Sequence, residues 1–331
     1  MPPILLILFW FLVLAVALVI LLKSAEYFVF IAELLGKKFK VPPFIIGATV
    51  VAFGTSLPEL AVGISSILQD QPEIITGTVV GSNISNIFFI TGIAIIISSG
   101  FFIHFKEHRI EFLLLIFSTL LGSYFLMDKA INIFEAIICL VLLAIYLVYV
   151  VGFTKNKPEE NTPSEVFLNW EKYTLFGLSV FGVWLGAKYT IDAITSISSI
   201  MKLGNDVISQ TVVALGTSLP ELAVTAAAVR SKQFGIVLGN VIGSNIFNLL
   251  AVLAIPALVG AFSNHPFLIQ DESLNVFGIP MMLLATGLLL LTSLFKKMPR
   301  SIGVLFLLLY LFFMVGSFMK INLKTLLEQL I

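Results

Sequence analysis

Long apolar runs separated by short polar stretches fill almost the whole chain. A membrane-spanning helix needs about 20 mostly apolar residues, because each residue adds only about 1.5 Å along the helix axis. Ten segments approach or exceed that length, namely residues 4–35, 42–68, 76–99, 110–127, 131–153, 171–203, 207–230, 235–261, 274–295 and 300–319. We therefore predict an all-α polytopic membrane protein with ten transmembrane helices.

The clearly polar, proline-containing stretch at residues 154–170 divides these ten segments into five and five. We predict a first five-helix repeat at residues 1–153, a cytoplasmic linker at 154–170 and a second five-helix repeat at 171–331. Because each half has an odd number of spans, the second half must enter the membrane from the opposite side. This is the inverted-repeat plan of many secondary transporters.

A heptapeptide, Gly-Thr-Ser-Leu-Pro-Glu-Leu, occurs at residues 54–60 and again at residues 216–222. Around it, residues 47–86 and 209–248 align without a gap at a constant offset of 162 and share 22 identical residues out of 40. Such self-similarity is typical of a duplicated structural unit. The two halves are therefore expected to present the same chemistry to the membrane interior.

Composition agrees with a membrane protein and excludes several classes of function. Hydrophobic residues make up 59% of the 331 residues and charged residues 11%, against roughly 25% charged in an ordinary soluble domain. Lys and Arg balance Asp and Glu at 19 each, so no net charge favours a nucleic acid partner. Cys139 is the only cysteine, which excludes an intramolecular disulfide or a thiolate zinc site. We expect no cofactor and no obligate protein partner.

The positions of the basic residues predict how the chain is oriented. If the N-terminus is outside, the predicted cytoplasmic loops hold 13 of the 19 Lys and Arg residues, and the outward loops and C-terminal tail hold 4. Basic residues are normally enriched in cytoplasmic loops. We predict that both termini lie outside and, from the compact form of the chain, that the membrane is a prokaryotic plasma membrane.

Each heptapeptide places one glutamate, Glu59 or Glu221, inside an apolar segment. A charge at the bilayer centre costs roughly 2.5–3.5 kcal/mol on insertion scales, so a duplication that keeps two acids needs a functional reason. The proline before each glutamate breaks the helix, and the freed carbonyl groups must bind protein, water or an ion. Hydroxyls three and four residues before each glutamate would share its face if helical spacing persisted. These hydroxyls belong to Thr55, Ser56, Thr217 and Ser218.

The next apolar segment of each half carries a polar stripe whose spacing of four residues keeps it on one helix face. Hydroxyl, carbonyl and carboxylate oxygens are hard ligands that suit Ca²⁺ or Na⁺. Asn83 and Asn245 lie one position off the stripe, and we expect them to bond to backbone groups in a supporting role. The stripe residues are Thr78, Ser82 and Asn86 in the first half and Asn240, Ser244 and Asn248 in the second.

Two carboxylates that converge from opposite halves would carry a charge of −2, which one Ca²⁺ neutralises. If Na⁺ uses the same oxygens, the two ions exclude each other, and an occupied site crosses the membrane more easily than an empty, charged one. This competition is the physical basis of exchange, so we favour an antiporter with Ca²⁺ and Na⁺ as its substrates. An intramembrane enzyme and a scaffolding protein with a vestigial ion site are weaker alternatives. The His-Glu-x-x-His metalloprotease motif is missing, and no Ser-His pairing is evident.

The two heptapeptides are each followed by a Gly-Ser-Asn run, at residues 81–86 and 243–248. Together these segments closely resemble the alpha repeats of the calcium/cation antiporter superfamily, and the sodium/calcium exchanger branch fits best. The resemblance implies that Glu59 and Glu221 are the central ion ligands and that neighbouring oxygens complete several ion sites. The further positions it implies are Thr55, Ser56, Thr217, Ser218, Ser82, Ser244, Asn86 and Asn248, with Ala52 and Ala214 acting through their carbonyl oxygens.

One position departs from the family pattern. Many sodium/calcium exchangers pair an Asn in one repeat with an Asp in the other, whereas this chain has Asn86 and Asn248. The centre therefore holds two acids rather than three, which leaves the coupling stoichiometry open. The heptapeptide favours sodium coupling, and exchange of Ca²⁺ or another cation for H⁺ stays the alternative. The linker is too short for the calcium-sensing domain of the large animal members.

Overall fold

The computed structural model describes residues 3–39, 41–70, 72–98, 108–128, 130–153, 169–200, 216–269, 274–295 and 298–318. Every regular element in these residues is a helix, with π-helical segments labelled η. The first half contains α1 (Pro3–Phe39), α2 (Pro43–Ile46), η1 (Gly47–Val51), α3 (Ala52–Thr55), α4 (Leu57–Ile67), α5 (Pro72–Ile84), η2 (Ser85–Ile90), α6 (Thr91–Ile97), α7 (Arg109–Met127) and α8 (Ile133–Phe153). The second half contains α9 (Trp170–Ile200), α11 (Leu219–Arg230), α12 (Phe234–Phe247), η4 (Asn248–Val252), α13 (Ala254–Phe262), η5 (Leu274–Gly278), α14 (Ile279–Ser293) and α15 (Arg300–Phe318).

Eight helical stretches within the described residues are long and apolar enough to cross a membrane. They coincide with eight of the ten predicted segments, while α9 and α11 occupy the sixth and seventh. The seventh segment before residue 216 lies outside the described residues, as does the linker from residue 154 to residue 168. The prediction of an all-α polytopic membrane protein built from two five-helix repeats is confirmed.

The predicted start of the third span was four residues late. The helix begins at Pro72 rather than at residue 76. A proline is accepted in the first turn of a helix, where its missing N–H would have no intrahelical partner. Glu73 also lies in this first turn, where a negative charge is favourable beside the positive end of the helix dipole.

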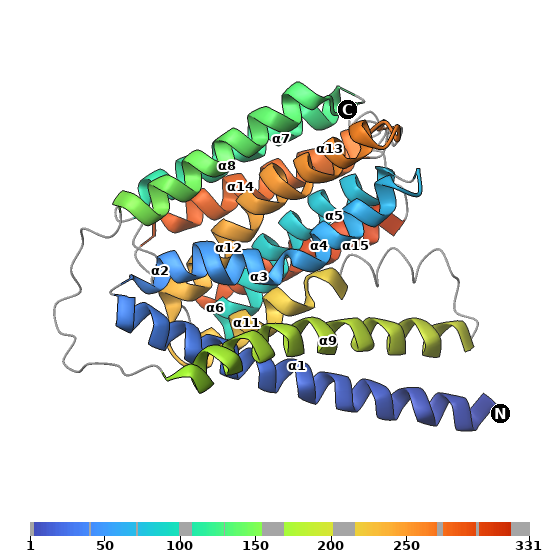
Figure 1. Ribbon diagram of the computed structural model, residues 1–331, viewed down its shortest axis with the longest axis vertical. Helices are drawn as coiled ribbons and strands as arrows, with labels where there is room; N and C mark the ends of the chain where they lie inside the picture. The colour runs from blue at the N-terminus through green and yellow to red at the C-terminus, as the bar shows by residue number, and fades with distance from the viewer. Residues whose placement is uncertain are drawn as a thin grey trace.

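The two halves are related by inversion, and the contact between their first helices displays it. Figure 1 shows α1 and α9 side by side along one edge of the bundle. A Cβ atom added to Gly182 would meet Ser24, whereas one added four residues later to Gly186 would meet Leu21. Residue numbers rise along α9 as they fall along α1, so the two helices run antiparallel. Equivalent helices of two repeats run antiparallel only when one repeat is inverted relative to the other.

Glycines let the motif segment of the first half pack directly against α12 of the second half. A Cβ atom added to Gly239 would meet the carbonyl oxygen of Phe44, and one added to Gly243 would lie 2.6 Å from that of Ala48. Small residues allow such backbone approach in membrane helix packing. The contact brings α3 against α12 and so joins the two halves beside both heptapeptides.

Four π-helical segments interrupt the long helices of the described chain, and the hydrophobic pattern predicted none of them. One of them, η1, directly precedes α3, while η2 and η4 include Asn86 and Asn248. Single π turns inside α-helices are frequent at functional sites. The carbonyl oxygen of Ala48 in η1 accepts a hydrogen bond of 3.2 Å from the Tyr146 hydroxyl on α8.

Candidate ion site between the two repeats

Both heptapeptides break their helix at the serine before the Leu-Pro-Glu segment. Ser56 has φ −88° and ψ 6°, and Ser218 has φ −85° and ψ 2°, which ends one helix and begins the next. The proline then lies in the first turn of α4 or α11, where it removes no hydrogen bond. The predicted break is therefore present in both repeats. It places Glu59 and Glu221 in the first turn of a helix, near the positive end of the helix dipole.

The two carboxylates are buried and lie close enough to interact. Glu59 and Glu221 are each 1% exposed, and each belongs to a different repeat. Ser56, three residues before Glu59, lies within hydrogen-bond distance of the Glu221 carboxylate. The expectation that the two acids converge between the halves agrees with this arrangement.

Each glutamate takes its hydroxyl partners mainly from the opposite repeat. The Ser56 hydroxyl donates to Glu221 Oε1 at 3.2 Å, and the carboxylate of Glu59 interacts with Thr217. Within its own repeat, Glu59 accepts a long hydrogen bond of 3.5 Å from Ser82. For Ser56 and Thr217, the expectation that the hydroxyls share the face of their own glutamate was wrong. Helical spacing does not persist through the break, which turns these hydroxyls toward the other half.

A chain of polar contacts extends from the carboxylates along α5 and α12. The hydroxyls of Ser82 and Thr217 lie 3.4 Å apart. The amide oxygen of Asn240 accepts from Ser244 at 3.3 Å and lies within 3.4 Å of the Thr55 hydroxyl. Asn240 also donates to the Thr225 hydroxyl at 3.2 Å, so both the oxygen and the nitrogen of its amide have protein partners. Ser82 and Thr217 thus lie at the site itself, whereas Asn240 holds the neighbouring side chains in place.

The two asparagines next to the stripe do bond to backbone groups. Asn83 donates to the carbonyl oxygen of Asn245 at 3.4 Å, and Asn245 donates to that of Val241 at 2.6 Å. Asn83 also accepts a hydrogen bond of 3.3 Å from the amide of Asn248, which ties the two repeats together. These contacts agree with the supporting role expected for Asn83 and Asn245.

Several buried oxygens in this region have no hydrogen-bond donor in the part of the chain that the structure describes. One oxygen of each carboxylate, Oε2 of Glu59 and of Glu221, is buried without such a donor. A buried acceptor without a donor costs about 1–3 kcal/mol, and more when it is charged. A cation held among these oxygens would remove that cost. The other oxygens of this kind on or next to the two polar stripes belong to Thr78, Ser85, Asn86, Asn245 and Asn248.

The remaining predicted site residues divide into described and undescribed positions. The carbonyl oxygen of Ala52 accepts from the Ser56 amide at 3.1 Å and lies 3.3 Å from the Thr55 hydroxyl. Ser218 is buried in the break of the second repeat. Ala214 lies outside the described residues. Among the described side chains, no group of three or more His, Cys, Asp or Glu residues could hold a metal ion, so a cation here would rely on hydroxyl, amide and carbonyl oxygens besides the two carboxylates.

Sequence reasoning missed two residues that shape the site. Tyr146, on α8, donates a hydrogen bond to η1. Thr225, on α11, accepts a hydrogen bond from the side-chain amide of Asn240. Tyr146 is isolated among apolar residues, and Thr225 has no hydroxyl at the equivalent position of the first repeat, Gly63. Neither residue therefore belongs to the duplicated pattern that pointed to the others.

Comparison with known proteins agrees with this geometry. The family model described as sodium/calcium exchanger protein matches residues 9–153 and 172–319. The chain belongs to the sodium/calcium exchanger family. The two matched stretches lie on either side of the polar linker and cover most of the chain.

Individual known proteins resemble this chain over nearly its full length. An uncharacterized membrane protein, MJ0091 of Methanocaldococcus jannaschii, is 34% identical over 300 residues, which cover 89% of this chain and 93% of that protein. The sodium/calcium exchanger MaX1 of Methanosarcina acetivorans is 31% identical, covering 93% of this chain and 98% of its own length. A solved structure of the sodium-calcium exchanger NCX_Mj, soaked with Na⁺ and Sr²⁺, has a TM-score of 0.79 and 31% identity over 93% of this chain and 97% of that chain.

Proposed function

We propose that the chain is a secondary antiporter that exchanges Na⁺ for Ca²⁺ by alternating access at the site between α4 and α11. The observation that carries the proposal is the pair of buried carboxylates from opposite repeats, each with one oxygen that has no donor among the described residues. Membership of the sodium/calcium exchanger family supports cation exchange in general. The sodium-calcium exchanger NCX_Mj, which resembles this chain in structure, supports the particular pair of ions.

In the proposed mechanism, Glu59 and Glu221 bind Ca²⁺ between them, and the charge of the ion cancels their combined charge of −2. Oxygens of the neighbouring hydroxyl and amide groups complete the coordination. Na⁺ ions use an overlapping set of oxygens, so Na⁺ and Ca²⁺ cannot occupy the site together. The carbonyl oxygen of Ala52 binds an ion only after it loses one of its present hydrogen-bond donors, the Ser56 amide or the Thr55 hydroxyl. Ala214 is proposed as a carbonyl ligand because it is equivalent to Ala52 in the second repeat. The proposed hydroxyl and amide ligands are Thr55, Ser56, Ser82, Asn86, Thr217, Ser218, Ser244 and Asn248.

An exchanger of Ca²⁺ or another cation for H⁺ is the second candidate. Both acids of the site are buried carboxylates, and neither residue 86 nor residue 248 supplies a further acid. Protonation of the two carboxylates would neutralise the empty site in place of Na⁺. The two candidates therefore differ in which ion returns through the site, and a flux measurement separates them.

The direct test is ⁴⁵Ca²⁺ uptake by proteoliposomes under imposed Na⁺, K⁺ or H⁺ gradients. The proposal predicts uptake driven by an outward Na⁺ gradient, and Glu59→Gln or Glu221→Gln should reduce it to the level of empty vesicles. Glu73→Gln is the matched control, because Glu73 also lies in the first turn of a helix but is exposed. Uptake that follows a pH gradient without Na⁺ would favour proton exchange. Full transport by both glutamine variants would reject the site.

In the cell, we propose that the protein lies in the plasma membrane with both termini outside. The support is the excess of basic residues in the loops then assigned to the cytoplasm, 13 against 4. In that membrane, an inward Na⁺ gradient would drive Ca²⁺ out of the cell through the exchanger.

A further inference from the structure

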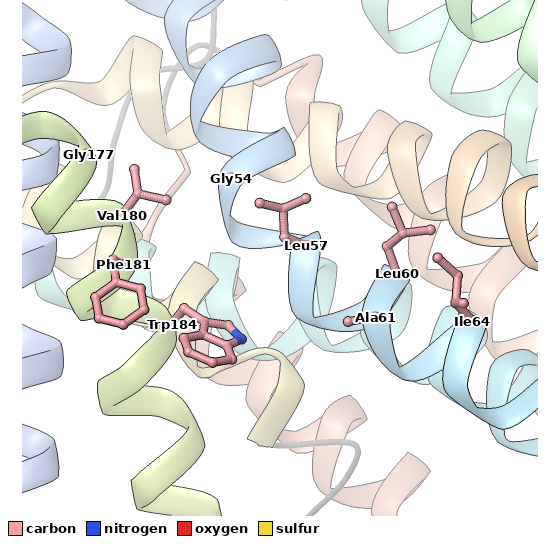
Figure 2. Close-up of a pocket in the computed structure, with 9 residues that line it drawn as sticks. All are labelled: Gly54, Leu57, Leu60, Ala61, Ile64, Gly177, Val180, Phe181 and Trp184. Atoms are coloured by element: carbon pink, nitrogen blue, oxygen red, sulfur yellow. The ribbon is translucent and has the colours of Figure 1, made fainter. Parts of the chain in front are cut away.

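An apolar cavity of about 470 Å³ lies between α9 and the α3–α4 segment that carries the first heptapeptide. Its volume falls within the roughly 300–1,000 Å³ of ordinary ligand sites. Figure 2 shows side chains from α4 on one side of the opening and side chains from α9 on the other. No residue that lines it is charged, and the indole nitrogen of Trp184 is its one polar side-chain atom. The walls are formed mainly by Leu57, Leu60 and Ile64 from α4 and by Val180, Phe181 and Trp184 from α9.

The cavity is bordered by exposed apolar side chains, as expected of a surface that faces the hydrocarbon of a membrane. Phe181 and Trp184 are 54% and 39% exposed in the isolated chain, and both belong to a helix at the edge of the bundle (Figure 1). A chain of methylene groups suits such a cavity, because the cavity offers no hydrogen-bond partner beyond one indole N–H. An ion or a polar metabolite would lose its hydration there without compensation.

A cationic group lies one helical turn from the cavity. The ammonium of Lys188 is 5.8 Å from the centroid of the Trp184 ring and 5.9 Å from that of Tyr189. Lys188 is exposed, and the carboxylate of Asp192 follows one helical turn further along α9. Trp, Tyr and Lys together are typical of the level at which lipid headgroups meet the hydrocarbon. The arrangement therefore places positive charge where a headgroup phosphate would lie.

We infer that this cavity is a binding site for an anionic phospholipid, with one acyl chain between α9 and α4 and the phosphate beside Lys188. The apolar walls account for the acyl chain, and the charge of Lys188 accounts for the preference for an anionic headgroup. Gly54 and Leu57 line the cavity and flank Thr55 and Ser56 along the chain. A bound acyl chain therefore touches the helix break that shapes the ion site.

The test uses the fluorescence of Trp184 and lipids with brominated acyl chains, which quench tryptophan on contact. The sequence contains three tryptophans, so the reporter protein carries Trp10→Phe and Trp170→Phe. It is reconstituted in phosphatidylcholine vesicles that contain either brominated phosphatidylglycerol or brominated phosphatidylcholine. We expect half-maximal quenching at an about fivefold lower fraction of the anionic lipid, the factor that corresponds to roughly 1 kcal/mol for one lysine near an anionic headgroup.

Three variants of the reporter separate a specific site from ordinary lipid contact. Lys188→Gln should abolish the preference for the anionic lipid, whereas Lys188→Arg should keep it. Ala61→Phe, which fills the cavity from α4, should reduce quenching by both lipids. A protein that keeps only Trp10, on α1, should show no headgroup preference. Equal quenching of Trp184 by both lipids would overturn the inference, as would a preference that survives Lys188→Gln in a variant with native helical circular dichroism. Because ion transport is not measured, failure here leaves the proposed exchange untouched.

Discussion

At the residue scale, a serine of one repeat donates to the glutamate of the other. The hydroxyl of Ser56 lies 3.2 Å from the carboxylate of Glu221, and both groups are at most 1% exposed. A hydrogen bond to a charged group contributes about 1.5–3 kcal/mol, because the carboxylate has no water to replace it. Neither repeat can therefore form its carboxylate site without the other.

Replacement of Ser56 by alanine should weaken Ca²⁺ binding by about tenfold or more, since a loss of 1.4 kcal/mol is a factor of ten. The variant loses both a proposed ligand and the donor that orients Glu221. Ser65→Ala is the matched control, because Ser65 is exposed on α4 and contacts Gln69 rather than the site. Titration of ⁴⁵Ca²⁺ binding to the purified protein measures both. Equal affinity in Ser56→Ala and the parent would contradict the assigned role.

The sequence predicted which side chains would be buried near one another, but it did not predict their partners. The duplicated motif identified Glu59 and Glu221 because a buried acid is costly and two copies of it are unlikely to survive without a use. The cross-repeat hydrogen bonds depend on how far the chain turns at Ser56 and Ser218. That turn is set by packing between the halves, which residue spacing within one half does not contain.

At the element scale, the close contact between η1 and α12 requires glycine at three points of the interface. A Cβ atom at Gly243 would lie 2.6 Å from the carbonyl oxygen of Ala48 and 2.8 Å from the Cβ atom of Ala52. Neither atom can move freely, because the carbonyl oxygen of Ala48 belongs to the backbone of η1 and the Cβ atom of Ala52 is fixed to the first residue of α3. The other two glycines of this interface are Gly47 and Gly239.

Gly243→Ala should therefore destabilise the protein by about 1–3 kcal/mol, the usual cost of adding a methyl group to a packed core. Gly287→Ala is the matched control on α14, because a Cβ atom there meets nothing within 4 Å. Helix propensity alone should leave that variant unchanged or slightly more stable. Thermal unfolding in detergent, followed by intrinsic fluorescence, compares the two. A normal melting temperature for Gly243→Ala would mean that the interface is looser than described.

Helix positions were largely predictable and π-helical segments were not. The ends of α7, and those of η5 and α14 taken as one helix, fall within two residues of the predicted boundaries, because polar residues bracket each apolar run. The π-helical segments η1 and η4 contain no proline and no charge that marks them in the sequence. They arise where helices of different repeats meet, so hydrophobic periodicity along one helix carries no signal for them.

At the scale of the whole molecule, the inverted arrangement makes equivalent residues face opposite sides of the membrane. Asp70 and Lys232 differ by the repeat offset of 162, and both adopt positive φ angles, 55° and 58°, after the equivalent helices α4 and α11. Both are exposed. They therefore form a matched pair of positions for testing the topology.

In a Cys139→Ala background, Asp70→Cys should react with a membrane-impermeant maleimide added to intact cells. Lys232→Cys should react only after the membrane is permeabilised, because the second repeat is inverted and its basic loop faces the cytoplasm. Labelling is read from the mass of the purified protein. Reaction of both cysteines from the same side would contradict the inverted repeat, and an exchange of the two results would reverse the proposed orientation.

The central claim is that Glu59 and Glu221 form one cation site shared by both repeats. Equilibrium ⁴⁵Ca²⁺ binding to the purified parent protein, Glu59→Gln and Glu221→Gln tests it most directly. The account predicts that either substitution alone weakens Ca²⁺ binding by about 100-fold or more, because charge count sets the affinity of such sites. Adding Na⁺ should displace Ca²⁺ from the parent. Parent-like Ca²⁺ affinity in either single variant would contradict a shared site.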